Sequence, residues 1–220
     1  MLQKSLYLLR RSLYLVLLPA VCSFPFSAES RTEAAGQATV RSAYGQKIQL
    51  EGIGNAGKVN GSLYRGAQPH ANSLAQLKAL GITTVVDLRG EDSGTREREK
   101  GEAESLGMRF VSIPISGWLP PTNQQVAQFL LLFRAAPNAK IFVHCRFGED
   151  RTGVLVATYR IAIEKWPAEQ ALREMYFFGF NGFWHRAMIS FVRDFPARLA
   201  SAPALADIRD QPAPADGQPN

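Results

Sequence analysis

Apolar and polar positions divide the chain into two kinds of segment. Short runs of β-branched and other apolar residues predict buried strands, whereas segments with apolar residues at every third or fourth position predict helices that bury one face. The predicted strands cover residues 62–65, 82–88, 108–113 and 141–144. The predicted helices cover residues 73–80, 95–106, 122–134, 153–165, 167–179 and 183–199.

Predicted strands and helices alternate, which is typical of an α/β protein with a largely parallel sheet. We therefore expect a central sheet of four to five strands flanked by helices. Ser73 and Thr122 stand where N-caps are expected, and Pro167 lies in the first turn of a helix, where proline is favoured. A chain of 220 residues suits one domain with a sizeable core.

The N-terminal segment, residues 1–28, resembles a targeting signal. Lys4, Arg10 and Arg11 precede or border an apolar stretch at 12–21 that is too short to span a bilayer comfortably. We expect export to the periplasm or the medium with cleavage. An uncleaved anchor, which would bring membrane contact, and lipidation at Cys22 remain alternatives.

The remaining chain divides by composition. Residues 29–57 are small and polar and predict a loosely ordered lead-in, residues 58–200 predict the folded domain, and the Ala/Pro/Asp-rich residues 201–220 predict a disordered tail. The net charge is +6, and three of those positive charges lie in residues 1–28, which hold no acidic residue. The mildly basic remainder has no cluster of Lys and Arg with interleaved aromatic residues, so we expect no nucleic-acid partner and a monomer.

The cysteine content points to one unusual thiol. The chain holds two cysteines, Cys22 and Cys145, and cleavage after Cys22 would leave a single one. A single thiol forms no internal disulfide, and an unpaired cysteine in an exported protein is a candidate for reactivity.

The stretch VHCRFGEDRTG at 143–153 surrounds that thiol. Cys145 follows a predicted strand and Arg151 begins a predicted helix, so the loop between them turns its backbone N–H groups toward one concavity beside a helix N-terminus. These groups and Arg151 lower the pKa of a cysteine and also bind a phosphate dianion. Gly148 allows a positive φ, and Thr152 can donate its hydroxyl to the thiolate. The pattern indicates attack on phosphorus through a cysteinyl-phosphate.

No cofactor or metal is expected for this chemistry. The three histidines, at positions 70, 144 and 185, are too dispersed in the sequence to indicate a metal site. His144 is interpreted as a residue that orients the loop rather than as a catalyst.

The motif His144-Cys145, five residues, then Arg151-Thr152-Gly153 matches the HCx5R[ST]G signature of the cysteine-dependent protein tyrosine phosphatase superfamily. The chain resembles its small bacterial dual-specificity-type members. The resemblance implies a phosphatase domain at 58–200, with a strand, a phosphate loop and a helix forming the active site. The similar segments are 64–69, 81–91 and 144–161, within residues 58–195.

The resemblance also implies site residues. It implies a nucleophilic Cys145, a phosphate-gripping Arg151, and supporting roles for His144 and Thr152. The residues expected to line the bound phosphate are Arg146, Phe147, Gly148, Glu149, Asp150 and Arg151.

One departure concerns the general acid. Superfamily members usually carry an aspartate on a separate loop some thirty residues before the cysteine, yet residues 111–125 contain neither Asp nor Glu. Some relatives, including myotubularin-like phosphatases, have an aspartate just before the loop arginine. Asp150 stands there, so we predict that it is the acid, with Glu149 as the alternative.

Several interpretations stay open at this stage. The charged segment 90–107 is predicted to be surface. Three strand-end residues either face the cleft or form salt bridges, namely Arg65, Asp87 and Arg89. The Trp118 side chain either lines the cleft or packs against the protein. The loop charges favour phosphotyrosine or another aryl phosphate as the group that is hydrolysed. The expected substrate is a phosphorylated protein or a small phosphate monoester. A phosphoinositide or inositol phosphate substrate and a catalytically weak phospho-binding module are the alternatives. Thiol redox or arsenate-reducing chemistry would need a resolving cysteine.

Overall fold

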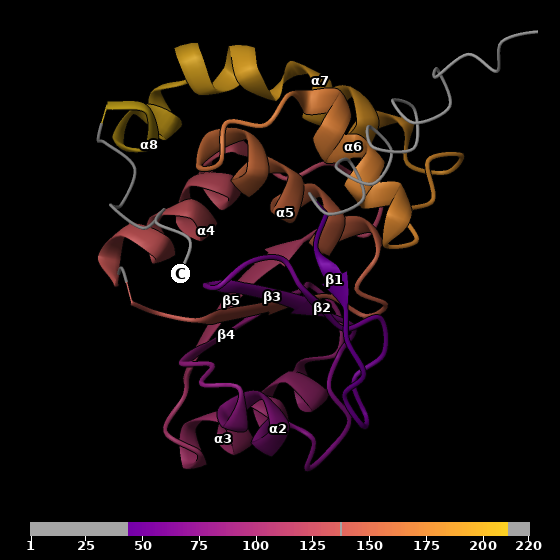
Figure 1. The fold of residues 1–220 in the computed structure, drawn as a ribbon, viewed down its shortest axis with the longest axis vertical. Helices are drawn as coiled ribbons and strands as arrows, with labels where there is room; N and C mark the ends of the chain where they lie inside the picture. The colour runs from indigo at the N-terminus through magenta and orange to yellow at the C-terminus, as the bar shows by residue number, and fades with distance from the viewer. Residues whose placement is uncertain (1–43, 137, 211–220) are drawn as a thin grey trace, which may run out of the picture. The chain divides into compact units, whose positions relative to one another are not determined.

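A computed structural model describes residues 44–210 except residue 137, and these residues form a layered α/β domain (Figure 1). A six-stranded sheet in the order β1-β2-β3-β6-β4-β5 lies between two groups of helices. Four neighbouring strands run parallel, as predicted, in the order β3, β6, β4 and β5. The bounds of these four are Leu63–Gly66, Ile141–His144, Thr84–Arg89 and Arg109–Ile115.

The sheet has more strands than the four to five predicted. Strands β1 (Gln46–Lys47) and β2 (Gly57–Lys58) extend it antiparallel beyond β3. Each has only two residues, so neither leaves an alternating pattern long enough to be recognised in the sequence.

Helices cover both faces of the sheet. On one face lie α2 (Leu74–Ala79) and α3 (Ser93–Ser105), which share a hydrophobic cluster with Val85 and Phe142. Four long helices pack into the larger cluster on the opposite face. They are α4 (Asn123–Ala135), α5 (Asp150–Ala162), α6 (Ala168–Phe177) and α7 (Arg186–Ser201).

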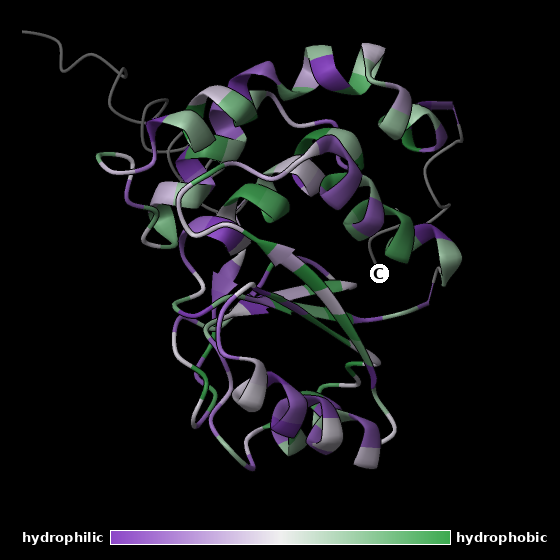
Figure 2. Ribbon diagram, turned by 180° about the vertical axis from the view of Figure 1, so that it is seen from behind, coloured by the Kyte–Doolittle hydropathy of each residue, from purple (hydrophilic) through white to green (hydrophobic). Residues whose placement is uncertain are grey.

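The hydropathy of each element matches its place. Helix α5 is buried from Arg151 to Ala162 and is the central helix of the larger cluster. By contrast, α3 is largely hydrophilic, and the strands between the two layers are largely apolar (Figure 2). This is the arrangement that the sequence pattern predicts for a sheet covered on both faces.

Two predicted N-caps have different outcomes. Thr122 caps α4 in a reciprocal capping box with Gln125, which satisfies two otherwise unpaired backbone N–H groups. Ser73 precedes α2, but its hydroxyl donates to the carbonyl of His70 and forms no cap. Both residues therefore occupy the predicted N-cap positions, but only Thr122 forms the capping hydrogen bond.

The predicted lead-in is wrong where the structure describes it. Residues 44–57 were expected to be loosely ordered, yet Ile53 and Ala56 are buried against Tyr64 and the α2 side of the sheet. The Asn55 side chain donates hydrogen bonds to the backbone near residues 148 and 178. Long-range contacts hold this polar segment in place.

The predicted tail is also wrong for residues 201–210. They form a 3₁₀ turn, η1 (Pro203–Leu205), and helix α8 (Ala206–Asp210). Leu205 and Ile208 are buried in the larger cluster, and Arg134 of α4 donates to the carbonyls of residues 207 and 208. The expectations for residues 1–43, including the targeting signal, and for 211–220 lie outside the described residues.

The strand register brings three chain segments to one edge of the sheet. Gly66 of β3 and Asp87 of β4 both pair with His144 of β6. The carboxyl ends of these parallel strands therefore meet directly beside Cys145, the position at which open α/β sheets bind ligands.

Candidate active site

The signature loop, residues 145–151, connects β6 to α5. Gly148 has φ +70°, and a Cβ atom there would lie 2.4 Å from the carbonyl carbon and oxygen of Gly66. Only glycine fits both the left-handed backbone and this close approach. The structure thus supports the expectation that Gly148 allows a positive φ. It also shows that the loop packs against β3 at this glycine.

Three neighbours hold the carbonyl groups of the signature loop. Arg65 Nη2 donates to the Gly148 carbonyl at 2.6 Å, Asn55 Nδ2 donates to the same oxygen at 3.1 Å, and the Gln68 N–H donates to the Arg146 carbonyl at 3.3 Å. Carbonyls that point outward turn the amide N–H groups of the loop toward its concavity, which is the arrangement of an anion-binding nest.

Arg65 is buried behind the loop, so neither of the two predicted environments is correct. Its guanidinium lies 4.1 Å from the centre of the Phe178 ring, and among the residues that the structure describes it forms no strand-end salt bridge. Burial lowers the pKa of Arg65 to about 10. The side chain therefore supports the loop through its hydrogen bond to Gly148 and its cation–π contact.

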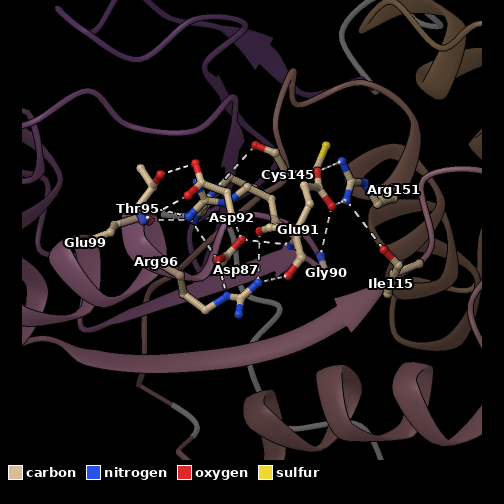
Figure 3. Close-up of polar contacts among 12 residues, drawn as sticks. Asp87, Gly90, Glu91, Asp92, Thr95, Arg96, Glu99, Ile115, Cys145 and Arg151 are labelled. Carbon is tan, nitrogen blue, oxygen red and sulfur yellow. Dashed lines mark hydrogen bonds and ion pairs between the residues drawn. The ribbon is translucent and has the colours of Figure 1, made fainter.

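Cys145 is buried at the base of the loop, beside Arg151 (Figure 3). Arg151 forms a two-pronged ion pair with Glu91, from Nη1 to Oε2 at 2.9 Å and from Nη2 to Oε1 at 2.8 Å. Nη1 also approaches the Ile115 carbonyl at 3.5 Å. A guanidinium has five N–H donors, so Nε–H and the second Nη2–H are left for an anion.

The charges at this pair reinforce each other. Hydrogen bonds from Arg151 lower the pKa of Glu91 to about 2. Burial lowers the pKa of Arg151, but its bonds to Glu91 and the charge of Cys145 outweigh burial and raise it above its ordinary value. Both partners are therefore ionised at neutral pH, and the positive guanidinium lies beside the Cys145 sulfur.

A buried polar network lies on the α3 face of the sheet (Figure 3). His144 Nε2 lies 2.7 Å from Glu99 Oε1, and Glu99 Oε2 accepts from Arg89 Nη2 at 2.6 Å. Arg89 forms a second two-pronged pair with Asp87, which Arg96 also approaches at 3.3 Å. Asp87 and Arg89 thus form the strand-end salt bridge, and neither is assigned to the cleft.

The network links His144 to the Glu91 segment. Arg96 donates to the carbonyls of Arg89 and Glu91, at 2.7 and 3.1 Å. The prediction that segment 90–107 is surface is therefore wrong for Glu99, which is buried, and for Arg96, which is half-buried. Glu91 is exposed as predicted, yet it pairs with Arg151. The available signal was that Glu91 follows a predicted strand at the same sheet edge as Cys145.

The two carboxylates of the loop lie toward the segment between α6 and α7. Asp150 Oδ1 accepts from the Asn181 N–H at 3.0 Å, and its Oδ2 lies 3.5 Å from His185 Nε2. Glu149 lies beside Gly179, and burial followed by the charge of Asp150 raises its pKa. No role for His185 is predicted from the sequence, because its distance along the chain from the loop hides this contact.

The remaining predicted site residues fall into two groups. Arg146 and Phe147 are exposed, with the guanidinium 5.3 Å from the ring centre, so the loop backbone at these positions is what faces the concavity. Thr152 is fully buried, and within the described part of the chain its hydroxyl has no hydrogen-bond partner. That spare donor fits the expected contact with the thiolate.

Trp118 is exposed to 71%, and its ring lies 5.7 Å from that of His185. It is therefore at the site's margin and not in the core.

Across residues 44–136 and 138–210 the structure shows no group of three or more His, Cys, Asp or Glu that could hold a metal ion. No helix within the same ranges is long and apolar enough to cross a membrane.

Comparison with known proteins places this geometry in a family. The family model described as "DSP-PTPase phosphatase fused to NAD+ Kinase" matches residues 46–194. The dual specificity protein phosphatase TpbA of Pseudomonas aeruginosa (strain UCBPP-PA14) is 30% identical over 127 residues, which cover 58% of this chain and 56% of that protein. Human dual specificity protein phosphatase 26 is 31% identical over 127 residues, or 55% of this chain and 58% of that protein.

A solved structure shows the same similarity. A crystal structure of P. aeruginosa TpbA in complex with pTyr has a TM-score of 0.60 and 29% identity, covering 73% of this chain and 97% of that chain. The chain spans just over half the length of the curated relatives it matches. Because the family model covers more than half of the chain, including the signature loop, the chain belongs to the DSP-PTPase phosphatases, as a small dual-specificity-type member of the cysteine-dependent protein tyrosine phosphatase superfamily.

Proposed function

We propose that the protein hydrolyses phosphate monoesters through a cysteinyl-phosphate formed on Cys145. The observation that carries the proposal is the placement of a buried thiol beside Arg151, whose free donors complete a nest of loop N–H groups. The family match supports the same chemistry.

The first step transfers the phosphoryl group to the enzyme. The Cys145 thiolate attacks phosphorus, an S–P bond forms, and the ester P–O bond breaks. Arg151 and the loop amides hold the three non-bridging oxygens, where negative charge is spread in the transition state. Thr152 donates to the sulfur when it becomes a leaving group in the second step.

Asp150 supplies and recovers the proton. In the first step its carboxyl proton passes to the departing ester oxygen, which leaves as an alcohol or phenol. In the second step the Asp150 carboxylate takes a proton from water as that water attacks phosphorus, the S–P bond breaks, and inorganic phosphate and the thiolate are released. The position of Asp150 at the loop, next to Arg151, supports this role, and Glu149 is the alternative acid.

The substrate is a phosphorylated protein, with phosphotyrosine as the preferred residue. The exposed aromatic rings of Phe147 and Trp118 at the site margin favour an aryl group over a heavily charged inositol ring. The two loop carboxylates, Glu149 and Asp150, also disfavour a substrate with several phosphates. TpbA, a similar protein, has been crystallised with pTyr.

The covalent mechanism is tested with nitrophenyl phosphate and the full chain under reducing conditions. Turnover should continue in the presence of a chelator and should disappear in Cys145→Ser. Tight phosphate binding without turnover by the unaltered, folded chain would contradict the proposal and favour a phospho-binding module.

The acid is tested by comparing leaving groups. Asp150→Asn should reduce kcat on a phosphoserine peptide by ~10²–10⁴-fold, with a much smaller loss on nitrophenyl phosphate, whose leaving group departs as a stable anion. Asp194→Asn, which alters an exposed carboxylate on α7, is the matched control. Equal losses on both substrates for Asp150→Asn would contradict the assignment, and a selective loss for Glu149→Gln alone would transfer it to Glu149.

A further inference from the structure

Asp150 is held on both of its carboxylate oxygens by one segment, the connection between α6 and α7. The Asn181 N–H donates to Oδ1 at 3.0 Å, and His185 Nε2 lies 3.5 Å from Oδ2. A backbone donor and an imidazole at ion-pair distance therefore face the two oxygens of the carboxyl group. Each oxygen keeps a second lone pair for the proton that the reaction moves.

His185 is itself fixed in place. It is 8% exposed, its ring centre lies 5.7 Å from that of Trp118 and 6.2 Å from that of Phe180, and its backbone begins α7. The imidazole thus contacts two aromatic rings from different segments. This packing limits its rotation and keeps Nε2 directed at Asp150.

The buried polar atoms of the imidazole indicate its tautomer. Within the described residues Nδ1 is buried and has no hydrogen-bond partner. An orphaned buried N–H group is rarer than an unpaired acceptor. This assigns the hydrogen to Nε2, the nitrogen that lies 3.5 Å from Asp150 Oδ2.

We propose that His185 is the positioning residue of the general acid, holding the Asp150 carboxyl in line with the leaving-group oxygen. Trp118 supports it from the loop between β5 and α4. That loop lacks the acidic residue that superfamily members usually carry there. Its contribution to catalysis is to hold the His185 imidazole through the Trp118 ring. The inference rests on the proposed function, because it assigns a partner to the acid of that reaction.

Two substitutions separate positioning from packing. His185→Phe keeps an aromatic ring between Trp118 and Phe180 but removes the donor to Asp150. His185→Gln removes the aromatic ring but keeps an N–H donor, which its side-chain amide supplies. His70→Phe and His70→Gln, at an exposed histidine outside the site, are the matched controls.

The assay is kcat on aryl phosphates of rising leaving-group basicity, from nitrophenyl to phenyl phosphate, together with the free energy of unfolding of each variant. We expect His185→Phe to lose about tenfold on phenyl phosphate and less on nitrophenyl phosphate, below the full effect of removing a general acid. We expect His185→Gln to recover most of the loss. A uniform loss across the series, or a loss in Gln as large as in Phe, would overturn the proposal.

A double-mutant comparison gives a second readout. If His185 acts through Asp150, adding His185→Phe to Asp150→Asn causes no further loss on phenyl phosphate. Multiplied losses in the double variant would overturn the inference. These outcomes differ from failure of the proposed function, in which the unaltered chain would not hydrolyse nitrophenyl phosphate at all.

Discussion

Glu91→Gln changes the contact that orients Arg151. The carboxylate of Glu91 accepts two charge-assisted hydrogen bonds, at 2.9 and 2.8 Å, and both come from the terminal nitrogens of Arg151. Glutamine has the same shape but one acceptor, and its NH₂ group would face a guanidinium N–H. The guanidinium would therefore lose one hydrogen bond and face an N–H donor of the new amide. It would rotate out of the orientation in which its free N–H donors face Cys145.

The size of the effect follows from the contact. A hydrogen bond to a charged group contributes about 1.5–3 kcal/mol, and the 47% exposure of the Glu91 side chain places this one at the lower end. The loss of about 1.5 kcal/mol of transition-state binding corresponds to roughly a tenfold decrease in kcat/KM. Because Arg151 holds the phosphate in the substrate and in the transition state, both KM and kcat should change.

The assay is kcat/KM on nitrophenyl phosphate across pH, with Glu97→Gln, a change at an exposed glutamate of α3, as the control. The pKa of Glu91 is lowered to about 2 in the folded protein, so its interaction with Arg151 is complete above the ordinary pKa of a carboxyl and is lost as pH falls toward 2. The ratio of unaltered to variant activity should be constant between about pH 5 and 8. A ratio below about threefold, or one that changes across this range, would refute the reasoning.

Three further changes test other parts of the structure. Gly148→Ala should abolish turnover, measured with nitrophenyl phosphate, because its Cβ would overlap the Gly66 carbonyl; near-normal activity would contradict the loop geometry. Glu99→Gln should lower the free energy of unfolding in urea by about 3–5 kcal/mol, because Arg89 loses a buried charged partner, whereas a loss no larger than that of Glu97→Gln would show that the network is not coupled. Leu205→Ala should destabilise the chain by about 2–5 kcal/mol in the same assay, and no change would contradict docking of the C-terminal turn.

Local pattern was sufficient for most elements of the fold. Strand β6 has the bounds predicted from its apolar run, and α4 begins after the predicted cap Thr122. Helix α5 begins at Asp150, three residues before the predicted start at Gly153. The loop residues before Gly153 are polar, so their helical backbone is set by the tight turn at Gly148 and not by an apolar period.

The ends of the domain depend on contacts that no local pattern reveals. Residues 44–57 and 201–210 are polar or rich in alanine and proline, and a few buried side chains hold each in place. Ile53 and Leu205 are examples, because each is buried by elements distant in the chain. Composition averages over a window and therefore misses isolated anchoring residues.

The site divides in the same way. Cys145 and Arg151 belong to one short loop, so their spacing predicts that they lie together. Glu91, Glu99 and His185 reach the loop from other elements, and only the strand register and helix packing bring them there. Sequence therefore predicts the reacting groups, whereas the groups that orient them become visible in the folded chain.

The central claim is the covalent intermediate, and trapping it is the most direct test. The full chain would be mixed with nitrophenyl phosphate, quenched in acid, digested and examined by mass spectrometry. We expect one added phosphoryl group on the peptide that contains Cys145, and none in Cys145→Ser treated in the same way. Turnover by the unaltered chain without any phosphorylated Cys145, or with the phosphoryl group on another residue, would contradict the account.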